Sequence, residues 1–189
     1  MKNNVTVFLI LLISLTSCAA FERKMIKDDL QGITEDNVKR IEGKYNAGGY
    51  QHINSARTKS DETQGIANML SLSNTVTDKS NEIKIGLTPL GKKKSYELQF
   101  KLLRNDSLEY SFKYKAKLKN GLLLLDNYSS QCRGLPYVFG GCCSFQSRIG
   151  LTQDNHLLIQ DYYDNSGAVL FIFGAGYTIN YAEKYKRIQ

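Results

Sequence analysis

Apolar and polar residues alternate with a period of two from about Ser80 almost to the C-terminus. The alternation is clearest between Leu108 and Leu118, where every second residue is apolar and the residues between are Glu, Ser or Lys. Because successive side chains of a β-strand point to opposite faces, this period predicts strands with one buried and one hydrated face. Antiparallel sheets commonly expose one face to water, so the pattern restricts most of the chain to a mainly β, antiparallel fold.

Turn sequences separate the alternating runs, among them Asn165-Ser166-Gly167, and Asn120-Gly121 is the most informative of them. Both residues tolerate the positive φ that a two-residue type I′ hairpin requires. Such a hairpin pairs Leu118 with Leu123 and Ala116 with Leu125, which places Leu123 and Leu125 in the interior. The alternate leucines then lie on the opposite face, which needs a cover of its own: Leu122 and Leu124.

The number and spacing of the runs predict about eight or nine short strands in a single domain over residues 34–189. Such a chain closes into an up-and-down antiparallel barrel or forms a strongly curved sheet, and closure also removes exposed strand edges. One or two short helices are expected before these strands. The first begins at Thr34 and the second follows Asp61, with apolar residues at helical spacing behind each.

The first residues have the order of an export signal, with Lys2 before an apolar run at residues 5–15 and small residues after it. The run is too short to cross a bilayer comfortably as a permanent helix. The sequence Leu15-Thr16-Ser17-Cys18 resembles the lipobox of bacterial lipoproteins, whose cysteine receives a diacylglyceryl thioether. The resemblance implies removal of residues 1–17 as a lipoprotein signal peptide, lipidation of Cys18, and a lipidated tether over residues 18–33. An ordinary signal peptide with Cys18 near its cleavage site is the alternative.

The same resemblance predicts where the protein lies. An Asp directly after the cysteine commonly retains lipoproteins in the inner membrane, and here Ala19 follows, so we expect the outer membrane and its periplasmic face. The lipid on Cys18 is the predicted link to that membrane, because no later apolar run is long enough for a transmembrane helix. The net charge of +7 could suit nucleic acid, but export places the chain where little nucleic acid is found. No nucleic-acid partner is therefore expected.

With Cys18 lipidated, three cysteines remain, Cys132, Cys142 and Cys143. An oxidising compartment favours a disulfide between Cys132 and one of the adjacent pair, and the sequence does not decide which. The segment from Ser129 to Phe145 is the least periodic part of the β region. It is predicted as a long connection that covers one end of the barrel, with a recognition loop as the alternative.

The strand rhythm resembles that of lipocalin-like, calycin-type barrels, some of which are bacterial lipoproteins. Their first strand contains Gly-x-Trp, and a late Arg packs over that ring; the matching residues are Gly43-Lys44-Tyr45 and Arg187, with Tyr in place of Trp. The resemblance implies a small apolar ligand in the barrel interior or at its mouth. The candidate ligand-binding residues are inward-facing aromatics, which alternatively fill the interior as core: Tyr96, Phe100, Tyr110, Phe112 and Tyr114.

Few residues suit catalysis or metal binding. His52 and His156 are the two histidines, and no Cys-x-x-Cys or His-x-x-x-His pair occurs. His156 with Asp154 and an upstream cysteine could be drawn as a catalytic triad, but a hairpin turn explains Asp154 and Asn155 better. We therefore expect neither an enzyme nor a bound cofactor or metal. The expected function is a lipid-anchored binding protein of the cell envelope, and the alternative is a structural lipoprotein that contacts another envelope protein or itself.

Overall fold

The computed structural model describes residues 21–72, 80–135, 139–169 and 173–188. These residues form one antiparallel sheet of 13 strands, with almost no helix. The strands are β1 (Leu30–Gln31), β2 (Gly43–Asn46), β3 (Gln51–Ile53), β4 (Lys59–Ser60), β5 (Glu82–Pro89), β6 (Ser95–Arg104), β7 (Ser107–Lys119), β8 (Leu122–Leu125), β9 (Ser129–Leu135), β10 (Phe139–Thr152), β11 (Leu157–Val169), β12 (Phe173–Tyr185) and β13 (Arg187–Ile188). The helical elements are single turns: η1 (Arg23–Met25), η2 (Val38–Ile41) and α2 (Ile66–Met69).

The sheet curls strongly into a half-barrel. Its hydrogen-bonded order is β13-β2-β5-β6-β7-β8-β10-β11-β12-β3-β4, and β1 and β9 pair with β10 outside this path. Within the described residues the two ends of the order, β13 and β4, do not pair with each other, so the sheet stays open. Of the two predicted architectures, the strongly curved sheet is therefore the one found. The predicted number of strands is too low, because short strands such as β1, β3 and β13 lack the alternation that marks the longer ones.

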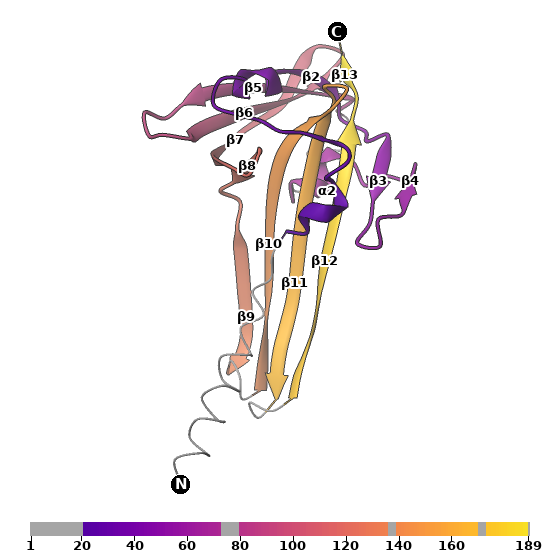
Figure 1. Cartoon of the computed structure of the whole chain (residues 1–189), viewed down its shortest axis with the longest axis vertical. Helices are drawn as coiled ribbons and strands as arrows, with labels where there is room; N and C mark the ends of the chain where they lie inside the picture. The colour runs from indigo at the N-terminus through magenta and orange to yellow at the C-terminus, as the bar shows by residue number, and fades with distance from the viewer. Residues whose placement is uncertain (1–20, 73–79, 136–138, 170–172, 189) are drawn as a thin grey trace.

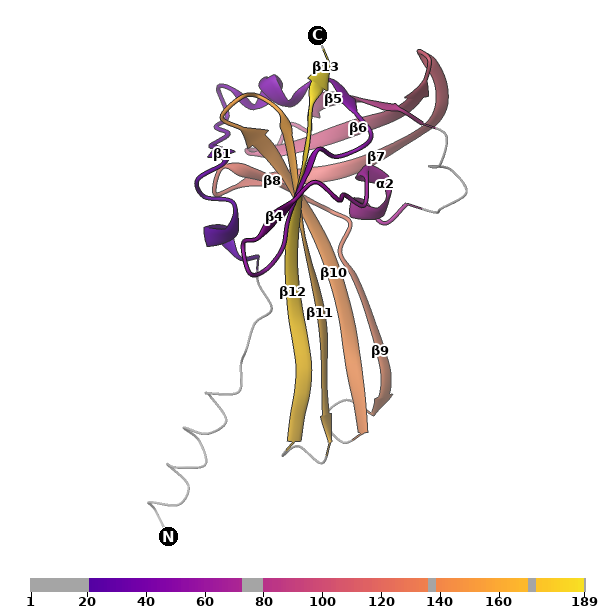
Figure 2. The same ribbon diagram turned by 90° about the vertical axis from the view of Figure 1, so that its right-hand side faces the viewer.

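Long strands give the molecule two parts, a curled head and a projecting arm (Figures 1 and 2). Strands β5 to β8 run across the head, whereas β10, β11 and β12 run along the long axis and extend well beyond it. We define the arm as β9 together with residues 139–146 of β10, 162–169 of β11 and 173–180 of β12, which pair with one another throughout. The C-terminus lies at the head end, opposite the end of the arm.

The predicted hairpin at Asn120-Gly121 is confirmed, with φ values of 54° and 81°. Leu118 pairs with Leu123 and Ala116 with Leu125, as the turn type requires. Leu123 and Leu125 are fully buried in the head. The opposite face is covered as well, because Leu122 packs in a second apolar cluster that the N-terminal segment supplies: Met25, Ile26 and Leu30.

The residues expected to form a tether are described from Phe21, and this part packs against the sheet. Met25 and Ile26 are buried, and Leu30 pairs with Thr152 of β10. These few apolar residues lack a period, which is why the sequence shows no element here. Figure 2 places this indigo segment on one side of the sheet and α2 on the other, so the root of the arm is covered on both faces.

Both predicted helices are reduced to single turns. The residues after Thr34 form η2, and those after Asp61 form α2, whose N-terminal residue follows Gly65 at φ 79°. The apolar residues at helical spacing are too few to sustain a longer helix, and they pack instead into the hydrophobic core. No helix among the described residues is long and apolar enough to cross a membrane.

The predicted connection at Ser129–Phe145 and the predicted turn near Gly167 are wrong, because both segments are strands of the arm. Cys142 pairs with Cys132 on one side and with Ser166 on the other, so β9, β10 and β11 form a continuous ladder here. A Cβ at Gly167 would lie 3.0 Å from the Gly140 carbonyl oxygen. The glycine therefore permits close backbone approach within the sheet rather than a turn.

Candidate functional site

The five predicted ligand-binding aromatics lie on the inner face of β6 and β7. Phe100 pairs with Phe112 across the two strands, and their rings stack with centroids 5.0 Å apart. The Phe112 ring is 5.5 Å from that of Tyr114 and 5.8 Å from that of Tyr110. Tyr96 lies on the same strand face, paired with Ala116 beyond this group. The half-barrel thus brings four of the five rings into one continuous row.

The solvent exposure of the side chains increases along this row from the core to the surface. Phe100 is fully buried and Tyr96 is 7% exposed, so these two fill the interior. Phe112 and Tyr114 are half-buried, and Tyr110 is 39% exposed. We call Tyr110, Phe112 and Tyr114 the aromatic stripe; it is the open, apolar end of the half-barrel's inner face.

One hydrogen bond links the stripe to Leu70, the residue that follows α2. The Tyr114 hydroxyl donates to the Leu70 carbonyl oxygen at 3.4 Å, and burial raises the pKa of this phenol above its ordinary value of 10.0. A shallow depression of about 480 Å³ lies elsewhere, between the turn at Gly121 and residues 33–36. None of the five predicted aromatics lines that depression.

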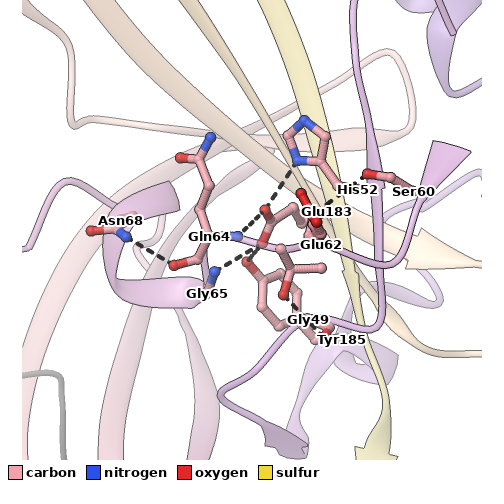
Figure 3. A network of polar contacts seen from close by, with 10 residues as sticks. Gly49, His52, Ser60, Glu62, Gln64, Gly65, Asn68, Glu183 and Tyr185 are labelled. Carbon is pink, nitrogen blue, oxygen red and sulfur yellow. Dashed lines mark hydrogen bonds and ion pairs between the residues drawn. The ribbon is translucent and has the colours of Figure 1, made fainter. Parts of the chain in front are cut away.

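A buried acidic network lies where β12 meets the loop before α2 (Figure 3). Glu183 of β12 is fully buried and accepts hydrogen bonds from the backbone N–H of Gln64 (2.6 Å) and of Gly65 (3.2 Å). The Tyr185 hydroxyl donates to the same carboxylate at 2.7 Å, and Nδ1 of His52 lies 3.1 Å from it. Glu183 therefore holds the loop before α2 against the sheet.

A second buried acid, Asp161, lies on β11 on the same face. Asp161 is fully buried, and neither carboxylate oxygen has a hydrogen-bond partner among the described residues. Burial raises the pKa of this carboxyl well above its ordinary value of 3.8, and the Glu183 charge raises it further, while the Ser147 hydroxyl opposes the rise. That hydroxyl donates its own bond to the Met69 carbonyl oxygen at 3.3 Å. The neighbouring Tyr181 phenol has its pKa raised to about 12, first by burial and then by these acids.

The cysteines lie on the arm. Cys132 and Cys142 form a disulfide across β9 and β10, which confirms the predicted bond and selects its partner. Cys143 is free, half-buried, and points to the other face, where its sulfur lies 3.4 Å from Asn165 Oδ1. Cys18, the predicted lipidation site, lies outside the described residues.

The triad that could be drawn around His156 is not assembled. His156 sits at the hairpin between β10 and β11, where its Nδ1 accepts the Arg187 N–H at 3.2 Å. Cys143 is eight residues from Leu151, the β10 residue nearest that hairpin in the ladder, which is roughly 26 Å along a strand. No group of three His, Cys, Asp or Glu residues in the described part of the chain is arranged to hold a metal ion.

The contact implied by the lipocalin-like resemblance is present. The Arg187 guanidinium lies 4.7 Å from the centre of the Tyr45 ring and donates to its hydroxyl at 2.6 Å. The same guanidinium lies directly over Gly43, where a Cβ would meet it. Burial raises the pKa of Tyr45 to about 12, against the effect of Arg187.

Sequence reasoning missed Glu183 and Asp161. The signal that could have found them is a break in the alternation, since each acid occupies an inward position between apolar neighbours: Ile159 and Tyr163 for Asp161, Tyr181 and Tyr185 for Glu183. Comparison with known proteins adds no family: no protein-family model matches the chain, and no curated protein sequence is significantly similar to it.

Proposed function

We propose that the chain is a lipid-anchored, non-catalytic binding protein of the bacterial cell envelope that takes an apolar ligand at the aromatic stripe. The observation that carries the proposal is the graded row of rings, in which buried Phe100 supports half-buried Phe112 and exposed Tyr110. A surface of this kind removes apolar area from water when a ligand covers it.

The stripe suits a flat or extended apolar molecule. The rings of Phe112 and Tyr114 meet edge to face at 70°, so a ligand finds both a ring face and a ring edge. The charged residues of β7 point to the other side of the sheet, because Lys113 and Lys115 alternate with the rings. The stripe itself therefore offers shape and apolar contact rather than charge.

The second part of the proposal concerns the location of the protein in the cell envelope. The export signal and the lipobox-like sequence at Cys18 support an anchor in the outer membrane, with the domain on its periplasmic face. Two or more acyl chains hold a protein at a bilayer stably, since each buried methylene contributes about 0.8 kcal/mol. The Arg187–Tyr45 contact supports a lipocalin-like relationship for the domain, which would fit a ligand-binding role.

Replacing Phe112 by Ala should weaken the uptake of an uncharged apolar fluorophore, N-phenyl-1-naphthylamine, about tenfold, because the ring supplies the centre of the stripe. Fluorescence titration measures the affinity. Lys115→Ala is the matched control, since it lies on the same strand with its side chain on the opposite face. Equal affinities for both variants and the parent would contradict binding at the stripe.

The anchor is tested separately by mass spectrometry of the N-terminal peptide from protein expressed with its signal. We expect a peptide that begins at Cys18 and carries acyl chains, and loss of membrane association in Cys18→Ser. An unmodified peptide that starts at another residue would reject the anchor and leave the stripe proposal standing.

A second candidate function is contact with a larger partner through the arm. The observation that favours it is exposure of large apolar side chains there, with Tyr177 53% and Ile179 42% exposed. Isolated exposed apolar residues are ordinary on protein surfaces, but these two lie on one face of the same strand.

A further inference from the structure

The net charge of the chain is concentrated in three consecutive strands of the head. Residues 82–119, which form β5, β6, β7 and the turns between them, contain ten basic and four acidic residues, a balance of +6. The rest of the chain contains fifteen basic and fourteen acidic residues and is almost neutral. About a fifth of the sequence therefore carries nearly all of the net charge of +7.

The lysines of these strands point to the outer face of the half-barrel, because they alternate with residues of the core. Lys84 of β5 lies directly opposite Lys101 of β6, and Lys115 and Lys117 lie on the same face of β7. Lys84, Lys115 and Lys117 are exposed, and Lys101 is half-buried. Strands β5 to β7 cross the head far from the tip of the arm (Figures 1 and 2), so the lysines form a surface of their own.

The acids of this face are already engaged with other lysines. Glu97 pairs with Lys113 at 2.7 Å, and Glu82 pairs with Lys44 at 2.8 Å. Four outward lysines therefore form no ion pair within the described residues, and we call them the basic face: Lys84, Lys101, Lys115 and Lys117.

The pairing of Lys84 with Lys101 is unfavourable in the isolated protein. Directly opposite side chains of an antiparallel pair have Cβ atoms about 5 Å apart, and like charges at that spacing lower stability. Lys44 lies opposite Lys84 on its other side, although Glu82 and Asp106 pair with this third lysine. The arrangement indicates that the unpaired lysines serve an anion that is not part of the chain.

Neutral polar side chains occupy outward positions between these lysines. Thr88, Gln99 and Ser111 point outward from β5, β6 and β7, and their side chains form no hydrogen bond within the described residues. Hydroxyl and amide groups both donate and accept hydrogen bonds. The face therefore combines cations, which suit acid groups, with hydrogen-bonding groups, which suit the hydroxyls of a sugar.

We propose that the basic face binds an acidic polysaccharide, whose acid groups lie against the lysines and whose hydroxyls bond to the neutral side chains between them. Ser111, which pairs with Lys101, and Lys117 are six residues apart on β7, a length of roughly 20 Å. A linear chain of several sugars covers that length. The inference goes beyond the proposed function and does not depend on it, because the aromatic stripe lies on the inner face of the same strands.

The composition of the basic face favours a sugar polymer over a bilayer or a nucleic acid. The outward positions of β5 to β7 between Lys84 and Lys117 hold no aromatic, arginine or large aliphatic side chain. Proteins that lie on a bilayer bury apolar side chains at the headgroup boundary. Single-stranded nucleic acids stack their bases on aromatic rings, and arginine is the usual residue for paired contacts to phosphate. Lysines with hydroxyl and amide neighbours supply charge and hydrogen bonds to a hydrated chain instead.

The test uses the full chain in non-ionic detergent and a fluorescently labelled oligomer of polygalacturonate, a linear polymer with a carboxylate on each sugar. Fluorescence anisotropy at low salt measures the affinity. The test variant replaces three exposed lysines of the basic face: Lys84→Gln, Lys115→Gln and Lys117→Gln. The matched control loses the same charge from exposed lysines outside residues 82–119 that form no ion pair within the described residues: Lys24→Gln, Lys27→Gln and Lys39→Gln.

We expect the test variant to bind the oligomer about a hundredfold more weakly than the parent, because each lysine at an anionic surface contributes about fivefold. The control should change the affinity by less than about threefold, since salt screens charges far from the ligand. Far-ultraviolet circular dichroism of both variants shows that the fold is retained.

Lys84→Gln alone gives a second measurement. It should weaken binding of the oligomer, yet leave the midpoint of urea unfolding unchanged or raise it, because it removes the repulsion from Lys101. A loss of binding together with a lower midpoint would show that Lys84 supports the fold and would count against the proposal.

Four further results would overturn the proposal. Absence of binding by the parent would exclude an acidic polysaccharide, and an equal loss of affinity in both triple variants would reduce the binding to net charge. Displacement of the oligomer by duplex DNA, or by micelles that contain phosphatidylglycerol, at lower concentrations than by unlabelled polygalacturonate would identify a nucleic acid or a lipid surface as the occupant. None of these results bears on the aromatic stripe or on Cys18.

Discussion

Glu183→Ala is expected to lower the free energy of unfolding by about 4 kcal/mol, because it leaves buried donors without their acceptor. The backbone N–H groups of Gln64 and Gly65 and the Tyr185 hydroxyl all donate to this carboxylate, and its side chain is fully buried. Small domains are stable by only about 5–15 kcal/mol in total. The variant should therefore unfold at a much lower urea concentration, measured by circular dichroism.

Tyr185→Phe is the matched control for this prediction. It keeps the buried ring and removes only the 2.7 Å bond from the phenol to Glu183, so its expected cost is about 1 kcal/mol. Hydrogen exchange gives a second readout, since the amides of Gln64 and Gly65 should lose protection in Glu183→Ala and keep it in Tyr185→Phe. A cost below that of the control, with both amides still protected, would show that the carboxylate does not hold the loop.

The strands of the head could be predicted because their side chains follow one rule. Alternation between Leu108 and Leu118 marks a strand with one wet face, and the structure has β7 there. The Asn120-Gly121 turn then fixed the pairing of β7 with β8, because a two-residue loop leaves one register. The aromatic stripe followed from the same phase, since Tyr110, Phe112 and Tyr114 share one face.

The arm could not be predicted in the same way. Its residues are mostly glycine, serine, asparagine and apolar side chains, and these are also the residues of turns and loops. Gly167 was expected in a turn, yet it lies opposite Gly141 in a straight ladder. The distinction depends on the neighbouring strand, because close approach of two backbones is a tertiary contact that no local pattern encodes.

The acidic network was missed for a different reason. Glu183 and Asp161 occupy inward positions. From the sequence alone, an isolated acidic residue at such a position suggests that the strand has changed which face it buries, or it is taken as a chance exception to the alternation. A buried acid is recognised by its hydrogen-bond partners, and these come from distant parts of the chain. Glu183 has the loop at Gln64 and Gly65, whereas Asp161 has no partner for its oxygens among the described residues.

Asp161→Asn is therefore expected to stabilise the protein, and to do so more strongly as the pH rises. Burial raises the pKa of Asp161 in the folded state well above the ordinary 3.8 of an unfolded chain. Below pH 3.8 both states hold the proton, and the carboxyl carries no ionisation penalty. As the pH rises above that value, the unfolded state releases its proton while the folded state retains it, so ionisation increasingly favours unfolding. The stability lost in this way continues to grow until the pH passes the folded pKa.

The amide of Asp161→Asn cannot ionise, so the variant escapes this loss, and at pH 8 we expect a gain of about 2 kcal/mol over the parent. Urea unfolding at pH 4, 6 and 8 measures it. Tyr163→Phe, two residues along on the same face, is the control: its phenol has a pKa raised above 10.0, first by the hydrogen bond with Cys143, so its effect should be the same at each of these pH values. A gain that stays constant or shrinks from pH 4 to pH 8 would mean that Asp161 is ionised in the fold. The carboxylate would then need a partner that the present contacts do not provide, because a buried charge without one costs several kcal/mol.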